Sequence, residues 1–383
     1  MPSGTQAFDW IVPDEWTIQD AFITDESGQK IVAFQENNLH ILGYSEPVDK
    51  WLTLDELEPH LYSLEDQPNA IPYVTSYYER RWGFCLPHNQ RKTLKAERYH
   101  VVVNSDLKPG VLNYGELILP GKTQQEVLLS TYICHPSMAN NELSGPVVTM
   151  ALAQWLSSLD IHHYTYRIVF IPETIGSIVY LSRNLDHLKQ HVIAGFNISC
   201  VGDDRVYSYL PSRDGNTLSD QAALHVLKYI DPEFKRYTWL DRGSDERQYC
   251  APGIDLPIAT IMRSKYGEYP EYHTSLDDLS LVTSSGLEGG FTALKKTLEI
   301  IERNVFPKTT VLGEPQLGKR ELYPKLSTKT SGEQVRAMMN LISYCDGQNS
   351  LLEIAELIEK PFWELVPIVE KLVDNGLLSI SAG

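Results

Sequence analysis

Apolar runs alternate with amphipathic segments through the middle of the chain. The apolar runs suit buried strands and lie at Val127–Cys134, Tyr166–Ile171, Ile193–Val201 and Ile258–Met262. The segments with helical spacing of apolar residues lie at Pro146–Leu159, Ile178–Leu188, Leu218–Tyr229 and Gly286–Val305. Continuous apolar strands that alternate with helices are typical of parallel sheets with helices on their faces. The pattern predicts an α/β fold with a mostly parallel sheet, whose ligand sites form at the carboxyl ends of the strands.

The region before this domain has a different pattern. Aromatic and β-branched runs at Tyr73–Tyr78, Tyr99–Val103 and Val111–Leu119 are separated by turn-forming segments. Such runs favour strands, and the turns between them favour antiparallel pairing. We predict a small β module at residues 71–121, inserted into a main domain that takes up residues 1–70 and 122–311.

Residues 312–383 have the pattern of a linker followed by a winged helix. Leu312–Thr330 is rich in Pro, Gly, Lys and Thr, as linkers are. Three helical segments and a short β-like run follow, at Gly332–Ser343, Leu351–Ile358, Phe362–Asn375 and Leu377–Ile380. Winged helices usually bind DNA, but this one carries seven carboxylates that phosphate would repel, at Asp346, Glu353, Glu356, Glu359, Glu364, Glu370 and Asp374. We therefore expect a packing or protein-contact module.

Composition narrows the classes of partner. The formal net charge of −17 argues against nucleic acid, since its binders cluster Lys and Arg against phosphates. No signal peptide is visible in Met1–Trp10, and no apolar stretch is long enough for a membrane span. The five cysteines are scattered, which is typical of reduced thiols in a cytoplasm. We expect a soluble cytoplasmic protein with no nucleic-acid or membrane partner, and the sequence leaves a homo-oligomer open.

The first candidate for chemistry is the segment Cys134–Pro146, where an apolar strand runs into a histidine, a polar loop and a helix. Imidazole and carboxylate are zinc ligands, so His135 and Glu142 could both reach one ion. The alternative is structural: His135 caps the strand and Glu142 interacts with the helix dipole.

The second candidate is Glu173, which directly follows a buried strand and precedes a glycine and a helix start. This place suits a metal ligand or a general base beside a water on a metal. The alternative is a cap of the next helix.

The third candidate is His273, with Asp277 and Asp278 close behind it in the sequence as carboxylates that could fix its tautomer. The alternative is a surface histidine. Upstream, Asp245 and Glu246 could serve the same site or pair with neighbouring arginines.

In this order the segments resemble the zinc aminopeptidases of the co-catalytic metallopeptidase class. That class has a His, a bridging Asp in an N-D-N-x-S-G loop, a Glu pair after a strand, an Asp at a strand end and a late His in Y-H-T-x-x-D. The corresponding positions here are His135, Asn140–Gly145, Glu173 and His273. The motifs C-H-P-S, P-E-T-I-G-S, S-D-E-R-Q-Y-C and Y-H-T-S-L-D-D are similar to a branch labelled as aminopeptidase-like proteins linked to polysaccharide biosynthesis. The resemblance implies a zinc-exopeptidase-like fold with an inserted β domain and a C-terminal winged helix, over nearly the whole chain.

The departures from the class concern the metal ligands. Asn141 stands at the position of the bridging Asp, the Glu pair is reduced to Pro172–Glu173, and no carboxylate stands at Ser199–Cys200. A single zinc held by His135, Glu142 and His273 fits these residues better than two, with Glu173 as the general base. Asn141, Asp245 and Glu246 remain candidates for metal or substrate contacts.

The leading hypothesis is a zinc-dependent, aminopeptidase-like hydrolase that cleaves an amide or peptide bond in a small substrate. One alternative is a non-catalytic binding or scaffold protein on a peptidase fold, which lost its metals with the change to Asn141. Another is a deacylase or amidase that acts on a sugar or a peptide-like metabolite.

Overall fold

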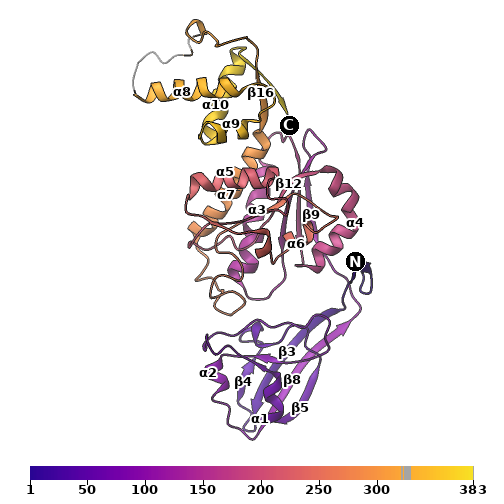
Figure 1. Cartoon of the computed structure of the whole chain (residues 1–383). Coiled ribbons are helices and arrows are strands. Elements are labelled where there is room, and N and C mark those ends of the chain that lie inside the picture. The colour runs from indigo at the N-terminus through magenta and orange to yellow at the C-terminus, as the bar shows by residue number, and fades with distance from the viewer. Residues whose placement is uncertain (321, 323–328, 383) are drawn as a thin grey trace.

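The computed structural model describes residues 1–320, 322 and 329–382. Figure 1 shows three parts in a row: a β domain near the N-terminus, an α/β domain in the middle and a helical domain at the C-terminus. In the described part of the chain no helix is long and apolar enough to cross a membrane.

The α/β domain is built on a mixed sheet of seven strands. The strand order is β14-β13-β15-β12-β10-β11-β9. The strands, from β9 to β15, are Gly115–Leu119, Glu126–Tyr132, Thr165–Ile171, Val192–Asn197, Ser208–Leu210, Lys235–Arg236 and Ile258–Met262. The central strands β11, β10, β12 and β15 run parallel, and β9 and β13 join the sheet antiparallel. The predicted mostly parallel sheet with helices is confirmed. The prediction was possible because buried strands appear in the sequence as continuous apolar runs.

Helices cover both faces of this sheet. The helices of the domain are α3 Ser144–Ser157, α4 Ile175–His191, α5 Leu218–Ile230, α6 Glu246–Tyr249 and α7 Ser284–Arg303, with short 3-10 turns such as η4 Trp239–Asp241. Helices α3, α5 and α7 share one apolar core with the sheet, whereas α4 and α6 contribute to the core on the opposite face. At the start of α3 a side chain at Gly145 would collide with the carbonyl oxygen of Ile198, at 2.4 Å from its Cβ. Glycine there lets the helix begin directly against the ends of the central strands.

The boundaries predicted for the β module are wrong. The β domain is an antiparallel sheet in the order β4-β3-β8-β5, built from β3 Glu15–Asp25, β4 Lys30–Ala33, β5 Val48–Thr53 and β8 Arg98–Lys108. Three of these strands precede residue 71, and β9, which was placed in the module, belongs to the main sheet. The run Tyr73–Tyr78 is not a strand. The prediction failed because long-range antiparallel pairing, here of β3 with β8, leaves no local signal in the sequence.

Short elements complete the N-terminal part. They are β1 Gln6–Ala7, β2 Trp10–Ile11, η1 Asn38–His40, α1 Leu54–Leu57, η2 Glu58–His60, β6 Leu61–Tyr62, β7 Phe84–Cys85 and α2 His88–Arg91. Ala7 and Val12 pack against Ile178 and Val179 of α4. The first residues of the chain therefore lie on the α/β domain, and the β domain follows them.

The C-terminal domain is a winged helix, as predicted. It comprises β16 Val305–Thr309, η5 Gly318–Arg320, α8 Lys329–Tyr344, α9 Leu351–Leu357, α10 Phe362–Asp374 and β17 Leu378–Ala382. Strand β16 was expected in the main domain, but it pairs antiparallel with β17 to form the wing. The predicted linker at 312–330 lies partly outside the described residues, and in its described part Leu317 and Leu322 are buried in the core.

The winged helix packs on the α/β domain through α5 and α9. Phe362 donates its backbone N–H to His225 Nε2 at 2.8 Å, and the other ring nitrogen of His225 contacts the Glu356 carboxylate. Lys228 donates to the same carboxylate at 3.0 Å. Glu356, one of the seven acidic residues of the winged helix, thus stabilises a contact between domains.

Candidate metal centre and active site

The site lies at the carboxyl ends of the sheet's parallel strands. His135 follows β10, Glu173 follows β11, and His273 lies in the long connection after β15. The rings of His135 and His273 are 4.8 Å apart between centroids, although 138 positions separate them in the sequence. The structure therefore brings together the two histidines from which a common metal site was predicted.

His135 lies between two carboxyl groups. Its Nδ1 is 3.3 Å from Glu142 Oε1, and its Nε2 is 3.7 Å from Glu173 Oε2. Burial, and then the neighbouring His273, lowers the pKa of His135 to about 3, and burial lowers the pKa of His273 to about 4. Both rings are neutral at pH 7, which is the form that binds a metal.

Glu142 lies in a π-helical turn, η3 Ala139–Leu143, that joins the histidine loop to α3. It is 3% exposed, and its Oε2 accepts the backbone N–H of Cys134 at 2.8 Å. Burial, and then the charge of Glu173, raises the pKa of Glu142 well above its usual range. A cation would reverse this effect, because it stabilises the ionised carboxylate.

Five buried side-chain atoms around this point have no hydrogen-bond partner among the described residues: His135 Nδ1, Asn141 Oδ1, Glu142 Oε1, Asp245 Oδ2 and His273 Nε2. Buried polar atoms are normally paired, since an unpaired one costs about 1–3 kcal/mol. These atoms are carboxylate, amide and imidazole acceptors, which are ligands of divalent cations. The predicted ligands His135, Glu142 and His273 each contribute one of them, so the donor set fits zinc. Their assignment as ligands stays a prediction.

Asn141 is held by its amide group. Its Nδ2 donates to the Tyr132 hydroxyl at 2.9 Å, which leaves Oδ1 as its free atom. A neutral amide with one free oxygen cannot replace the charge of a carboxylate between two cations. The chemistry of Asn141 thus fits one ion better than two, and the number of ions stays a prediction.

Glu173 faces the histidine from the carboxyl end of the neighbouring strand β11. Ser244 donates its hydroxyl to Glu173 Oε1 at 2.9 Å, so Oε2 is the oxygen that faces His135. Burial raises the pKa of Glu173 to about 7. A carboxyl group with a pKa near neutrality can both accept and release a proton in the working pH range.

Asp245 and Glu246 differ in their surroundings, although they are adjacent. Glu246 accepts hydrogen bonds from Gly243 N, Ser244 N, the Tyr266 hydroxyl and the Asn197 amide, so both of its oxygens are paired. Asp245 Oδ1 accepts from Thr174 N and Ser177 Oγ, whereas its Oδ2 is free. Burial, and then the Glu173 charge, raises the pKa of Asp245 to about 8. Glu246 thus orders the loop, and Asp245 is the better candidate for a direct contact in the site.

The predicted carboxylate partner of His273 is wrong. Asp277 accepts the backbone N–H groups of Asn140 and Asn141 at 2.6 and 3.0 Å, and Asp278 binds the exposed Ser280. The Tyr269 hydroxyl also donates to Asp277, at 2.9 Å. Asp277 therefore holds the π-helical turn that carries Glu142, because its two oxygens cap the free amides of that turn.

Replacing Asp277 with Asn should destabilise the fold by about 1–3 kcal/mol, since one buried backbone amide would lose its acceptor. We expect the variant to melt at a lower temperature than the wild type. It should also bind zinc more weakly, because Glu142 moves with the turn. Thermal denaturation with and without zinc would measure both. Asp278→Asn is the matched control. An equal loss of stability and of zinc binding in both variants would contradict this role of Asp277.

Two contributors to the site were not predicted. Tyr73, from the β domain, stacks on His135 with centroids 4.5 Å apart and lies edge-on to His273 at 5.2 Å. Its backbone N–H donates to the carbonyl of His273 at 2.8 Å. The second is Cys134, whose sulfur lies with His135 and Glu173 in one group. The pairing of Tyr73 with His273 bridges 200 positions and leaves no local signal, whereas the thiol adjacent to His135 was visible in the sequence.

Backbone strain is concentrated around the site. Ser137, Thr174, Cys200 and His273 adopt positive φ angles of 55°, 62°, 52° and 56°. Non-glycine residues in this region cost about 1–3 kcal/mol each and cluster at functional sites. The loops that carry His135, Glu173 and His273 each contain such a residue or lie beside one.

Comparisons with known proteins agree with this architecture. A model of the family described as "Domain of unknown function (DUF4910)" matches residues 1–304, and one described as "winged helix-turn-helix" matches residues 304–380. A Clostridium acetobutylicum protein, named as a polysaccharide biosynthesis protein with an aminopeptidase-like domain, is 42% identical over 355 residues. These are 92% of this chain and 81% of that protein.

Solved structures extend the comparison to the fold. A crystal structure from Clostridium acetobutylicum, named as a peptidase, has a TM-score of 0.93 at 40% identity and covers 99% of this chain and 87% of that one. A zinc aminopeptidase from Bacillus subtilis has a TM-score of 0.54 at 12% identity, over 75% of this chain and 82% of that one. The latter likeness shows that the α/β domain has an aminopeptidase-like fold.

Proposed function

The chain belongs to the family described as "Domain of unknown function (DUF4910)", and on this premise we propose that it is a zinc-dependent hydrolase of amide or peptide bonds, of the aminopeptidase type. The observation that carries the proposal is the group of buried, unpartnered ligand atoms beside Glu173. The aminopeptidase-like fold and the name of the Clostridium acetobutylicum relative support it.

In this proposal His135, Glu142 and His273 hold the metal. Zinc, when bound, supplies a Lewis acid that acidifies a water molecule and polarises the substrate carbonyl. Tyr73 and Tyr272 fix the two imidazoles, because Tyr73 stacks on His135 and Tyr272 stacks on His273 with centroids 3.8 Å apart. Ordered rings keep the ligand atoms in place before the substrate arrives.

Glu173 moves the proton. Its Oε2 accepts a proton from the attacking water as the water oxygen bonds to the carbonyl carbon. The same carboxyl then gives this proton to the leaving nitrogen as the carbon–nitrogen bond breaks, which yields a carboxylic acid and an amine. The hydrogen bond from Ser244 to Oε1 holds the carboxyl plane, so that Oε2 stays directed at the site.

Two other functions compete with this one. Asn141, a neutral amide at the position of the bridging carboxylate, favours a scaffold protein that has lost its metals. The name of the relative, which links it to polysaccharide biosynthesis, favours a deacylase or amidase of a sugar or peptide-like metabolite. The deacylase would use the same residues and differ in its substrate.

We also propose that the protein is cytoplasmic. All five cysteines are unpaired, and four of them are buried. Free thiols suit a reducing compartment, so we place the protein in the cytoplasm.

Metal analysis of the full chain, purified without added metal, tests the proposal. We expect about one zinc ion per chain by mass spectrometry, and hydrolysis of aminoacyl anilides that stops on chelation and returns with zinc. Hydrolysis of N-acyl sugars in place of the anilides would favour the deacylase. A metal-free chain that hydrolyses neither class of substrate, with or without added zinc, would show the scaffold.

A further inference from the structure

We propose that the Cys134 thiolate is itself a ligand of the metal in this site, an inference that rests on the proposed function. It would make the centre a mixed sulfur, nitrogen and oxygen site. Among the described residues, Cys134, His135 and Glu173 form a group of three potential ligands whose ligand atoms all lie within 4.8 Å of one another.

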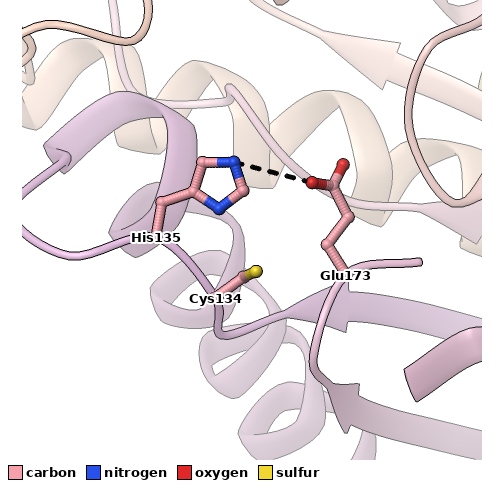
Figure 2. A group of neighbouring side chains, drawn as sticks. All are labelled: Cys134, His135 and Glu173. Atoms are coloured by element: carbon pink, nitrogen blue, oxygen red, sulfur yellow. Dashed lines mark ion pairs between the residues drawn. The ribbon is translucent and has the colours of Figure 1, made fainter. Parts of the chain in front are cut away.

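The local backbone lets two adjacent residues face the same point. In a strand, successive side chains point to opposite faces. Strand β10 ends at Tyr132, and the chain then bends through Cys134 and His135. In Figure 2 the carboxylate of Glu173 faces the imidazole ring of His135, and the sulfur of Cys134 points toward the space between these two side chains.

The separations are compatible with coordination. In a tetrahedral zinc site, bond lengths of about 2.3 Å to sulfur and 2.0–2.1 Å to nitrogen put neighbouring ligand atoms about 3.4–3.6 Å apart. The observed upper bound of 4.8 Å therefore requires a contraction of at most about 1.2–1.4 Å, which rotation of side chains supplies. The thiol proton would leave to solvent when the metal binds.

The other four cysteines have the surroundings of structural thiols. Cys85, Cys200, Cys250 and Cys345 are buried, and each lies in an apolar core cluster. Cys134 is partly exposed and belongs to none of these clusters within the described residues. Cys134 thus differs in its surroundings from the four core thiols.

Unpartnered atoms beside the thiol point to a cation independently. His135 is 9% exposed and Glu142 is 3% exposed, yet His135 Nδ1 and Glu142 Oε1 lack hydrogen-bond partners. The thiolate would also restore a negative charge that Asn141 does not provide. Zinc can expand from four ligands to five, so a sulfur ligand is compatible with hydrolysis.

A thiolate ligand has a consequence for metal choice. Sulfur favours zinc, cobalt and cadmium over magnesium, calcium and manganese. The proposal therefore distinguishes this centre from one built only of imidazole and carboxylate.

Cobalt substitution of the full chain tests the inference. Cobalt(II) bound to a thiolate shows a charge-transfer absorption in the near ultraviolet, in addition to the visible bands of the ion. We expect both in the wild type and in the matched control Cys345→Ser, whereas Cys134→Ser should keep the visible bands and lose the ultraviolet one. Visible bands without the ultraviolet absorption in the wild type would overturn this inference and leave the proposed function intact. A chain that binds neither cobalt nor zinc would overturn both.

Thiol titration of the native wild type provides a measurement without a variant. Because the other cysteines are buried, Cys134 should be the thiol that reacts in the metal-free chain. One equivalent of zinc should lower its rate of reaction by at least tenfold, and one equivalent of magnesium should not. An unchanged rate with zinc bound would contradict coordination by sulfur.

Discussion

Replacing Glu173 with Gln should lower the rate of hydrolysis by about 10²–10⁴-fold while about one zinc ion stays bound per chain. The amide keeps the size of the side chain and its contact with Ser244, but it cannot accept a proton from water. The loss should appear mainly in kcat, since proton transfer belongs to the chemical step and not to substrate binding.

Two measurements decide this prediction: steady-state hydrolysis of an aminoacyl anilide, and zinc content by mass spectrometry on the same sample. Glu288→Gln, at an exposed position on α7, is the matched control and should match the wild type in both. Near-normal kcat in Glu173→Gln would exclude it as the base. Loss of zinc along with activity would show that Glu173 is a metal ligand.

The parts of the fold that could be predicted from the sequence are those with a local signal. Strand β15 was predicted with the bounds that the structure shows, because Ile258–Met262 is buried along its whole length and sits between polar segments. The ends of such strands meet at one edge of the sheet, which is why His135 and Glu173 were found as neighbours.

The parts that could not be predicted depend on contacts between distant segments. Strand β3 alternates polar and apolar residues, and its partner β8 lies about 75 residues further along the chain. Tyr73 reaches His273 in the same way, across the boundary between two domains. Proximity in the sequence also led to a wrong prediction, that Asp277 is the partner of His273. Asp277 instead accepts the backbone amides of Asn140 and Asn141.

Hydrogen bonding of buried backbone amides explains why the position of Glu142 could not be predicted from the sequence. A buried backbone amide must find an acceptor, and the turn at Ala139–Leu143 has its first amides free. Asp277 satisfies two of them, which fixes where Glu142 stands. The position of Glu142, the predicted ligand, therefore depends on the hydrogen bonds of a loop, and these are visible only once the chain is folded.

Replacing His135 with Ala should abolish the thermal stabilisation that zinc gives to the wild type. A ligand present at 100 times its dissociation constant stabilises the folded state by about 2.7 kcal/mol, and each kcal/mol shifts the melting temperature of a large domain by about 2–4 °C. We therefore expect zinc to raise the melting temperature of the wild type by about 5–10 °C. His135→Ala should show no rise, because it removes a ring that borders both carboxyl groups.

The control for this prediction is His191→Ala. His191 is the last residue of α4, a helix of 17 residues that begins beside Glu173, so it lies about 24 Å from that end. Its zinc-dependent shift should equal that of the wild type. Calorimetry with zinc and with a chelator measures the shift for each protein. If His135→Ala kept the full shift, the ion would bind elsewhere and the centre at the ends of β10 and β11 would be excluded, whereas a shift lost in both variants would point to surface histidines. A loss confined to His135→Ala, combined with an active wild type, ties stability and hydrolysis to the same ion.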